Sequence, residues 1–445
     1  MREAHTAALA LLLALACAPG RGTAADGGEI APGLKVGDVL GPDNAQAAAG
    51  LLPPQILSHY AKGDYRNTIV DYPLGNPRWE KSFLEATEKN AGQLDVNDAG
   101  TIVFKGSGEQ PDYLYGIPFP TIDESDPKAA VKIVWNQFLA YWSGGNTFNE
   151  TKVLMLGPKA IDREIHADGY FLFYDGQSEK YRLPNPNNLQ SQFVGITTFP
   201  SDLRGTSSLT WRYRDTAKRD SVWAFVPALR RVRAVSPSNR SDGYLGSDIS
   251  GDDGFFFDGK PEDFEWKLVG KRDALRVVDP KSVEGNVPVP PAPGGGFQVL
   301  TFDNPVMAGY EDKNWPGLAW APVSAGLAKR PVWVVEGTPK DRYYLYGKLQ
   351  LSIDAETWDG AWNIKYSWQG DVVHSYQTMA RVNQPAADGE MIFASTQVWA
   401  CAENFKMNRA TLSGMRATPK SASIRRGPID TNVFDPQGLA TRYGK

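Results

Sequence analysis

The alternation of apolar and polar side chains along residues 151–403 constrains this chain more than any other feature. In the segment SLTWRYRD, Leu209, Trp211 and Tyr213 alternate with polar neighbours, so the two sets of side chains point to opposite faces of an extended strand. Similar segments recur at intervals of roughly 10–20 residues, separated by Gly, Asp, Asn and Pro. This pattern predicts a large antiparallel sheet.

The composition agrees with a chain of many strands. It contains 44 Gly, 32 Pro, 13 Trp, 18 Tyr and 19 Phe, which suits strands joined by turns better than a helical bundle. With 42% hydrophobic and 22% charged residues, the chain is near the globular average, which excludes a disordered chain, a coiled coil and a polytopic membrane protein. The net charge of -4 argues against a general affinity for nucleic acid.

Two segments before the predicted sheet have the pattern of helices. Residues 79–92 and 127–143 each carry apolar side chains at helical spacing. Asp126 suits the N-cap of the second helix, and Gly144 suits its end. We therefore expect residues 26–150 to form a part made of helices and loops, with the second helix lying on the sheet.

The N-terminus has the layout of a secretory signal peptide. Arg2 precedes the 12-residue apolar run Ala7–Ala18, and small residues lead to a cleavage site near Ala25. The run is too short to span a bilayer, which takes about 20 residues. Residues 1–25 are therefore predicted to be removed, leaving a soluble periplasmic protein. Lipidation of Cys17 is the alternative, but Ala14 stands where the bacterial lipobox prefers Leu.

Common catalytic motifs are missing from the sequence. It has no G-x-S-x-G, H-E-x-x-H, C-x-x-C, Walker A or dinucleotide-binding motif. His59, His166 and His374 are far apart in the chain, so a site with several His ligands is not expected. We predict no metal, no cofactor and no enzymatic activity. A glycosidase with paired carboxylates stays an alternative, because aromatic side chains can stack on sugars.

Residues 204–266 contain the densest set of charges. A basic block precedes an acidic one, and the simplest arrangement pairs them on neighbouring strands and loops. Alternation allows Arg231 to meet Asp248 or Asp252. Calcium binding near Asp248 is less favoured, because the segment departs from the EF-hand spacing. The residues that we assign to a structural or partner-recognition motif are Arg230, Arg231, Arg233, Asp248 and Asp253.

Large aromatic side chains lie between these charges, and we expect them to line an apolar concavity. Phe255, Phe256 and Phe257 cannot all face one core in a strand, because successive side chains alternate. At least one of them is expected in a loop or facing a cavity. The candidate ligand-binding residues are Trp211, Tyr213, Trp223, Phe225, Phe256 and Trp266.

The segment that carries these motifs resembles a known group of proteins. Trp223, Phe225 and Pro227 lead into RRVR at 230–233, and GSDIS follows at 246–250. This order resembles LolA-like periplasmic proteins, the outer membrane lipoprotein-sorting proteins. The greater length and the strand YLYGKLQLSIDAETWDG are similar to their longer relatives, the domain of unknown function 1329 family.

The resemblance implies a mainly β (α+β) fold. The expected architecture is a large curved antiparallel sheet or half barrel, with a few helices packed on or lidding an apolar concave face. Residues 26–445 would form one domain, with the sheet over 151–403 and a basic tail over 404–445. No catalytic residues come with the resemblance.

The resemblance further implies a periplasmic binding or carrier protein for a lipid or another hydrophobic molecule. An apolar inner face exposed to water is unfavourable, so a ligand or a lid is expected to cover it. The implied partners are an exporter of the resistance-nodulation-division type and an outer-membrane protein. Two alternatives stay open: an envelope hydrolase, carbohydrate-active or other, that uses paired carboxylates, and a structural subunit of an exporter.

Overall fold

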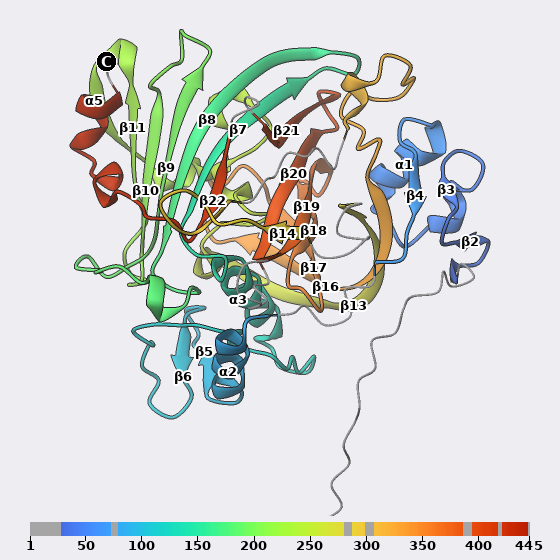
Figure 1. Cartoon of the computed structure of the whole chain (residues 1–445). Coiled ribbons are helices and arrows are strands. Elements are labelled where there is room, and N and C mark those ends of the chain that lie inside the picture. Colours follow the sequence, from blue (N-terminus) through green and yellow to red (C-terminus); the bar gives the residue numbers. More distant parts are fainter. Residues whose placement is uncertain are drawn as a thin grey trace, which may run out of the picture.

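The computed structural model describes residues 28–72, 79–279, 287–298, 307–385, 394–416 and 421–443 (Figure 1). The predicted signal peptide and Cys17 lie outside these ranges. Among the helices within them, none is long and apolar enough to cross a membrane.

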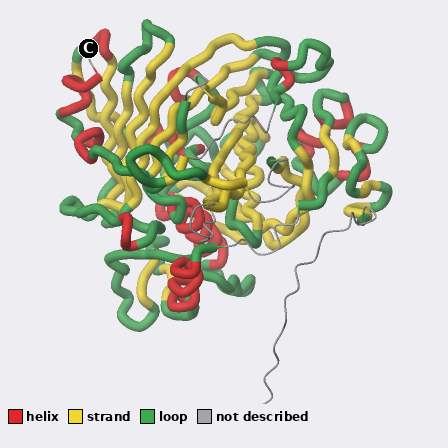
Figure 2. Tube along the Cα trace, in the orientation of Figure 1, coloured by secondary structure: helices red, strands yellow, loops and turns green. Residues whose placement is uncertain are grey.

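One large antiparallel sheet dominates the molecule (Figure 2). Hydrogen-bonded neighbours run in the order β12-β11-β10-β9-β8-β7-β21-β20-β19-β18-β17-β16-β13. In the described part of the chain, β12 and β13 pair on one side only and form the edges. The expected mainly β fold is confirmed. The strands are β7 (Thr147–Leu156), β8 (Ile161–Phe173), β9 (Leu189–Phe199), β10 (Ser207–Tyr213), β11 (Ser221–Val226), β12 (Arg231–Val235), β13 (Phe264–Val278), β16 (Gly326–Pro339), β17 (Lys348–Asp354), β18 (Gly360–Tyr366), β19 (Val372–Pro385), β20 (Ala394–Asn404) and β21 (Arg409–Arg416).

Short strands complete the architecture. β22 pairs with β7 and β15, β14 runs parallel to β19, and β4 joins β16 to β3. Through β14 and β15 the pairings close into a ring that includes β7 and β19 to β22. β1 with β2 and β5 with β6 form two separate hairpins. The bounds are β1 (Glu29–Ala31), β2 (Leu34–Lys35), β3 (Val39–Leu40), β4 (Asn67–Ile69), β5 (Leu94–Val96), β6 (Ile102–Phe104), β14 (Val287–Val289), β15 (Phe297–Gln298) and β22 (Ser423–Arg425).

The described α-helices are α1 (Pro54–Lys62), α2 (Lys81–Asn90), α3 (Ala129–Trp142) and α5 (Gly438–Tyr443). Both helices predicted before the sheet are confirmed as α2 and α3. Helix α3 begins at Ala129 and not at Pro127. The Asp126 carboxylate accepts the Lys128 backbone N–H at 2.8 Å, so Asp126 holds a turn that precedes the helix.

Helix α3 lies in the concave face of the sheet. The Arg212 guanidinium on β10 lies 5.9 Å from the Phe138 ring of α3, and the helix also packs on β13 and β16. Nine strands separate β10 from β13 in the sheet order, so a flat sheet would hold these two strands about 48 Å apart. One helix can contact both only because the sheet curves around it. The predicted helix on a concave face is confirmed.

Apolar cores lie on both faces of the sheet. The core on the concave side joins α3 to side chains of β16 and β17, among them Trp333 and Leu351. On the convex side, Trp362 and Cys401 pack with the N-terminal part of the chain, including Ile56 of α1. Every residue of α3 except Lys132 is buried. Burial on nearly all sides explains the wide apolar stripe in its sequence.

The C-terminal part differs from the expected basic tail after residue 403. β21 pairs with β20 and β7, so Ala410 and Leu412 complete the convex core. Two of its basic side chains, Arg425 and Arg426, are buried inside the protein. Arg425 lies 5.0 Å from the Tyr141 ring, and Arg426 forms a buried ion pair with Glu80. Residues 409–416 and 423–425 therefore belong to the sheet.

Candidate ligand-binding site

Three half-buried phenylalanine rings lie together on the concave face, next to α3. The rings of Phe171 on β8 and Phe193 on β9 are stacked with centroids 4.5 Å apart. Phe255 lies 4.6 Å from Phe171 and stacks on Tyr141 of α3 at 3.6 Å. We call Phe171, Phe193 and Phe255 the aromatic platform. Its rings are partly open to solvent, so a ligand could cover them.

The local sequence explains why the platform forms. Phe171 and Phe193 are directly paired across β8 and β9, and Gly169 and Gly195 are paired two positions away on the same face. A Cβ at Gly195 would stand 3.0 Å from the Phe193 ring, and one at Gly169 would stand 3.1 Å from the Phe171 ring. Each ring therefore leans over the glycine two residues from it. Sequence reasoning missed Phe171 and Phe193, although alternation in this segment put Phe171 and Gly169 on one face.

The three consecutive phenylalanines lie in a loop, as predicted for at least one of them, and each contacts different residues. They follow the short 3-10 turn Gly251–Asp253. Phe256, at φ 108°, is fully buried against Gly360 of β18. Phe257 packs on Trp266 with centroids 5.3 Å apart. Of the candidate ligand-binding residues, Phe256 and Trp266 thus belong to the core around α3, and their neighbour Phe255 is the one that meets the platform.

The other candidates lie on the opposite, convex face. Trp211, Tyr213, Trp223 and Phe225 pack beneath the C-terminal turn Thr431–Phe434 and α5. The Trp211 Nε1–H donates to the Phe434 carbonyl at 3.0 Å. The structure therefore separates the six candidates into two groups. The four on β10 and β11 are covered by the chain's own C-terminal segment.

Buried ion pairs hold the loop that carries Phe255. Arg212 binds Asp220 at 3.3 Å and Asp258 at 3.2 Å. Arg240 binds Asp220 at 3.2 Å and Asp252 at 2.6 Å. Burial lowers the pKa of the Arg212 guanidinium, but Asp258 and Asp220 raise it more, so the net shift is upward. These pairs fix the loop against β10 and leave the guanidinium of Arg212 charged.

The predicted pairing of Arg231 with Asp248 or Asp252 is wrong. Asp248 instead binds Arg409 of β21 at 3.0 Å. Asp253 forms a buried ion pair with Lys365 of β18 and also accepts the Ser250 backbone N–H at 2.7 Å. The acidic loop folds over the middle of the sheet, where β18 and β21 supply the cations. The remaining members of the predicted motif, Arg230, Arg231 and Arg233, are exposed at the β12 edge.

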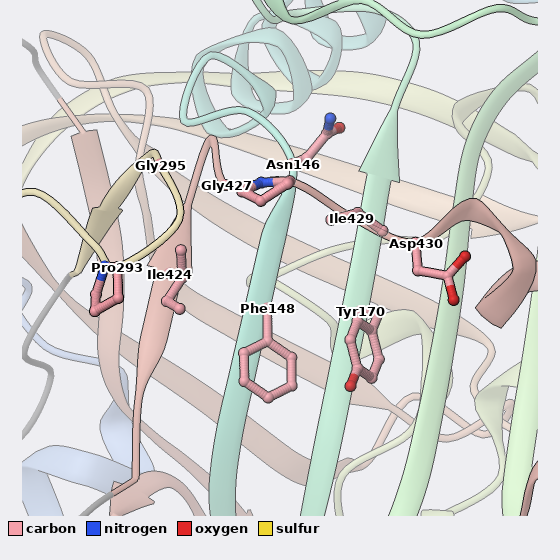
Figure 3. Close-up of a pocket in the computed structure, with 10 residues that line it drawn as sticks. Asn146, Phe148, Tyr170, Pro293, Gly295, Ile424, Gly427, Ile429 and Asp430 are labelled. Carbon is pink, nitrogen blue, oxygen red and sulfur yellow. The ribbon is translucent and has the colours of Figure 1, made fainter.

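A second apolar site lies on the convex face, in a pocket of about 190 Å³ (Figure 3). Phe148 of β7 and Tyr170 of β8 form one wall, with ring centroids 4.7 Å apart. Pro293 and the segment 424–430 form the rest. For comparison, an apolar cavity of about 150 Å³ accepts benzene. The pocket therefore suits a small apolar group and not a whole lipid.

A carboxylate pair lies two residues further along the same strands, on the same face. Glu150 and Asp168 are directly opposite across β7 and β8. Burial and the nearby Glu150 raise the pKa of Asp168 to about 6. Glu150 also accepts the Ala422 backbone N–H at 2.7 Å. This pair was not singled out from the sequence, since nothing in its spacing marks it.

Comparisons with solved structures give matches at low identity. A putative outer membrane lipoprotein-sorting protein domain from Vibrio parahaemolyticus is 13% identical, with a TM-score of 0.46, over 71% of this chain and 100% of that one. A DUF1329 family protein from Desulfovibrio piger is 15% identical, with a TM-score of 0.45 over the same shares. A LolA superfamily protein from Nitrosomonas europaea is 12% identical, with a TM-score of 0.37, over 67% of this chain and 95% of that one.

No curated protein matches the chain. The family described as "Protein of unknown function (DUF1329)" matches residues 42–440. This range begins just after β3 and ends within α5, so it includes the described strands from β4 to β22. The chain therefore belongs to the DUF1329 family.

Proposed function

We propose that this protein binds a hydrophobic molecule on the concave face of its sheet and carries it through the periplasm. The aromatic platform is the observation that supports this most. Phe171 contacts both Phe193 and Phe255, and such a group of rings at a partly open site favours an apolar ligand over a polar one. The neighbouring helix α3 is apolar and contacts the platform through Tyr141, so it serves as one wall of the site.

The platform can supply useful binding energy. A phenylalanine side chain has roughly 150–250 Å² to bury, and burial of apolar surface contributes about 25 cal/mol per Å². A ligand that covers the open part of each ring, at most about a third of its surface, gains up to about 1–2 kcal/mol per ring before the costs of association. An acyl chain or a flat apolar molecule has the shape to do this.

Titration of lipid-free protein with a fluorescent fatty acid tests the proposal. We expect saturable binding that Phe193→Ala weakens at least fivefold, because that variant removes one ring of the platform. Tyr343→Ala is the matched aromatic control, since Tyr343 lies in the loop between β16 and β17 and its side chain is 89% exposed. Equal affinities for wild type and Phe193→Ala would contradict the proposed site. The lack of saturable binding by wild type would contradict the proposed function.

Export to the periplasm is part of the proposal and rests on residues 1–25. N-terminal sequencing of the protein from its own cells should find a chain that begins near Asp26. A lipid-modified Cys17 as the first residue would make it a lipoprotein, and an intact Met1 would contradict export. An exporter of the resistance-nodulation-division type and an outer-membrane partner stay predictions from the resemblance, testable by crosslinking in the periplasm.

Hydrolysis by paired carboxylates is a second candidate function, favoured by Glu150 and Asp168. A carboxyl group whose pKa is about 6 can act as a general acid near neutral pH. Tyr170, two residues from Asp168 on β8, lines the apolar pocket of Figure 3. A panel of chromogenic glycosides and esters tests this candidate. Turnover that Asp168→Asn removes would support it, and the lack of turnover by wild type would exclude it for those substrates.

A further inference from the structure

We propose that the ligand is an amphiphile with one anionic headgroup, which Arg231 and Arg233 bind at the edge of the concave face. This inference rests on the proposed function, because the hydrophobic chain would occupy the aromatic platform. It adds the position and the chemistry of the headgroup.

Strand register connects the platform to these arginines. Gly169 pairs with Gly195, Gly195 with Ser208, and Ser208 with Ala224. Ala224 in turn pairs with Arg233. Directly opposite residues point to the same face, so these residues form one row across the concave face, from β8 to the edge strand β12. The row covers three strand spacings from Gly195 to Arg233, about 14 Å.

The row forms an open track beside the platform. Between the leaning Phe193 ring and Arg233, its side chains are no larger than those of serine and alanine. Ser208 and Ala224 are half-buried, so solvent reaches this part of the sheet. The next row on the same face contains Thr210 and Val222, which pair with each other. An apolar chain can lie along the track with one end on the platform and the other at β12.

The charge at the end of the track favours an anion. Arg231 and Arg233 alternate onto the same face, and both are exposed. Among the residues that the structure describes, no carboxylate lies within ion-pair distance of either. Guanidinium groups bind the oxygens of a carboxylate or a phosphate through paired N–H groups. A neutral headgroup leaves this charge without a partner, and a cationic headgroup is repelled by it.

Arg231 and Arg233 differ from three other basic residues of the concave side. Arg212, Arg240 and Lys365 already bind Asp258, Asp252 and Asp253 in the loop that covers the sheet. Their positions are fixed by those ion pairs. Arg231 and Arg233 stand on an edge strand with no neighbour beyond it among the described residues, so a headgroup can approach them directly from solvent.

Four amphiphiles with the same twelve-carbon chain test this inference: dodecanoate, dodecyl phosphate, dodecanol and dodecyltrimethylammonium. Calorimetric titration below their micelle concentrations should show that wild type binds at least one anion tenfold or more tightly than dodecanol, and the cation most weakly. The two anions distinguish a carboxylate from a phosphate headgroup. Arg231→Gln/Arg233→Gln should reduce the anion to the affinity of dodecanol and leave dodecanol unchanged.

Arg272→Gln is the matched control, because Arg272 is an exposed arginine on the other edge strand, β13. It should keep the preference for the anion. Ser208→Phe blocks the track, so it should also abolish the preference while dodecanol still binds the platform. Circular dichroism checks that each variant is folded.

Two results separate the two proposals. If wild type binds dodecanol and both anions equally, or if the double variant keeps the tenfold preference, the headgroup inference is wrong and the apolar site stands. If wild type binds none of the four amphiphiles, the proposed function is wrong, and the headgroup inference fails with it.

Discussion

Lys365 and Asp253 form an ion pair between β18 and the acidic loop, with side chains 3% and 1% exposed. Burying such a pair costs free energy of desolvation, and a single charge left buried without its partner destabilises the protein even more. The Ser250 backbone N–H and hydroxyl also donate to Asp253, at 2.7 and 2.9 Å. At the scale of the residue, this one carboxylate therefore fixes the loop that presents Phe255 to the platform.

Breaking this pair should destabilise the protein strongly. We expect Lys365→Met to lower the free energy of unfolding by about 3–5 kcal/mol, because it leaves Asp253 charged and buried. The double variant Lys365→Met/Asp253→Asn should lose less than the sum of the single losses. Urea unfolding measures all three. Glu85→Gln, which removes an exposed pair with Lys81, should change stability by less than about 1 kcal/mol. Strict additivity would show that the two residues do not interact.

His374 on β19 should make stability depend on pH. Burial and the charge of Lys365 lower its pKa to about 4, and the Tyr346 hydroxyl lies 2.8 Å from its Nδ1. The unfolded chain binds this proton near pH 6.5, whereas the folded chain binds it near pH 4. The stability that neutral His374 contributes is therefore full above pH 6.5 and lost as the pH falls from 6.5 to 4.

The comparison of wild type with His374→Gln isolates this contribution. Over the window from pH 6.5 to 4, the difference in their free energies of unfolding should change by a few kcal/mol, since one pKa unit corresponds to about 1.4 kcal/mol. Denaturant unfolding at several pH values gives the difference. A difference that stays constant over this window would show that His374 titrates normally in the folded protein.

At the scale of the element, side-chain alternation predicted which side chains share a face of a strand. It did not predict where that face lies on the molecule. Leu209, Trp211 and Tyr213 do share one face of β10, as their spacing indicated. Alternation cannot say which face is concave, because that depends on how the whole sheet curves. The aromatic residues of β10 and β11 were therefore expected in the concavity, while the structure places them on the convex face.

The C-terminal segment covers that aromatic face. Loss of its packing should lower the free energy of unfolding. Phe434 is 2% exposed and receives the Trp211 indole N–H through its backbone carbonyl. We expect Phe434→Ala to lower the free energy of unfolding by about 3–5 kcal/mol and to shift tryptophan emission to the red. Leu84→Ala on α2 is the control, because Leu84 is 45% exposed. Unchanged stability and emission in Phe434→Ala would show that the segment packs loosely.

At the scale of the whole molecule, the sequence predicted the class of fold and missed the way in which distant segments complete it. The period of two marks each strand of the sheet by itself, since it depends on local solvent exposure. The pairing of β21 with β7 and the ion pair between Asp248 and Arg409 join segments far apart in the chain. No local pattern encodes such contacts. The sequence therefore predicted a basic tail after residue 403, where the structure has the sheet strands β21 and β22.

This arrangement predicts that the protein unfolds as one unit. Strands from both ends of the chain, β4 and β22, are hydrogen-bonded into the same sheet as the central strands, so no part can separate without breaking the sheet. Calorimetry should show a single transition for the mature chain. A ligand at 100 times its Kd adds about 2.7 kcal/mol to the folded state. With an unfolding entropy of roughly 0.8 kcal/mol/K for about 400 residues, the transition should rise by about 3 °C. Two separate transitions, with the ligand moving only one of them, would show instead that the sheet consists of independent parts.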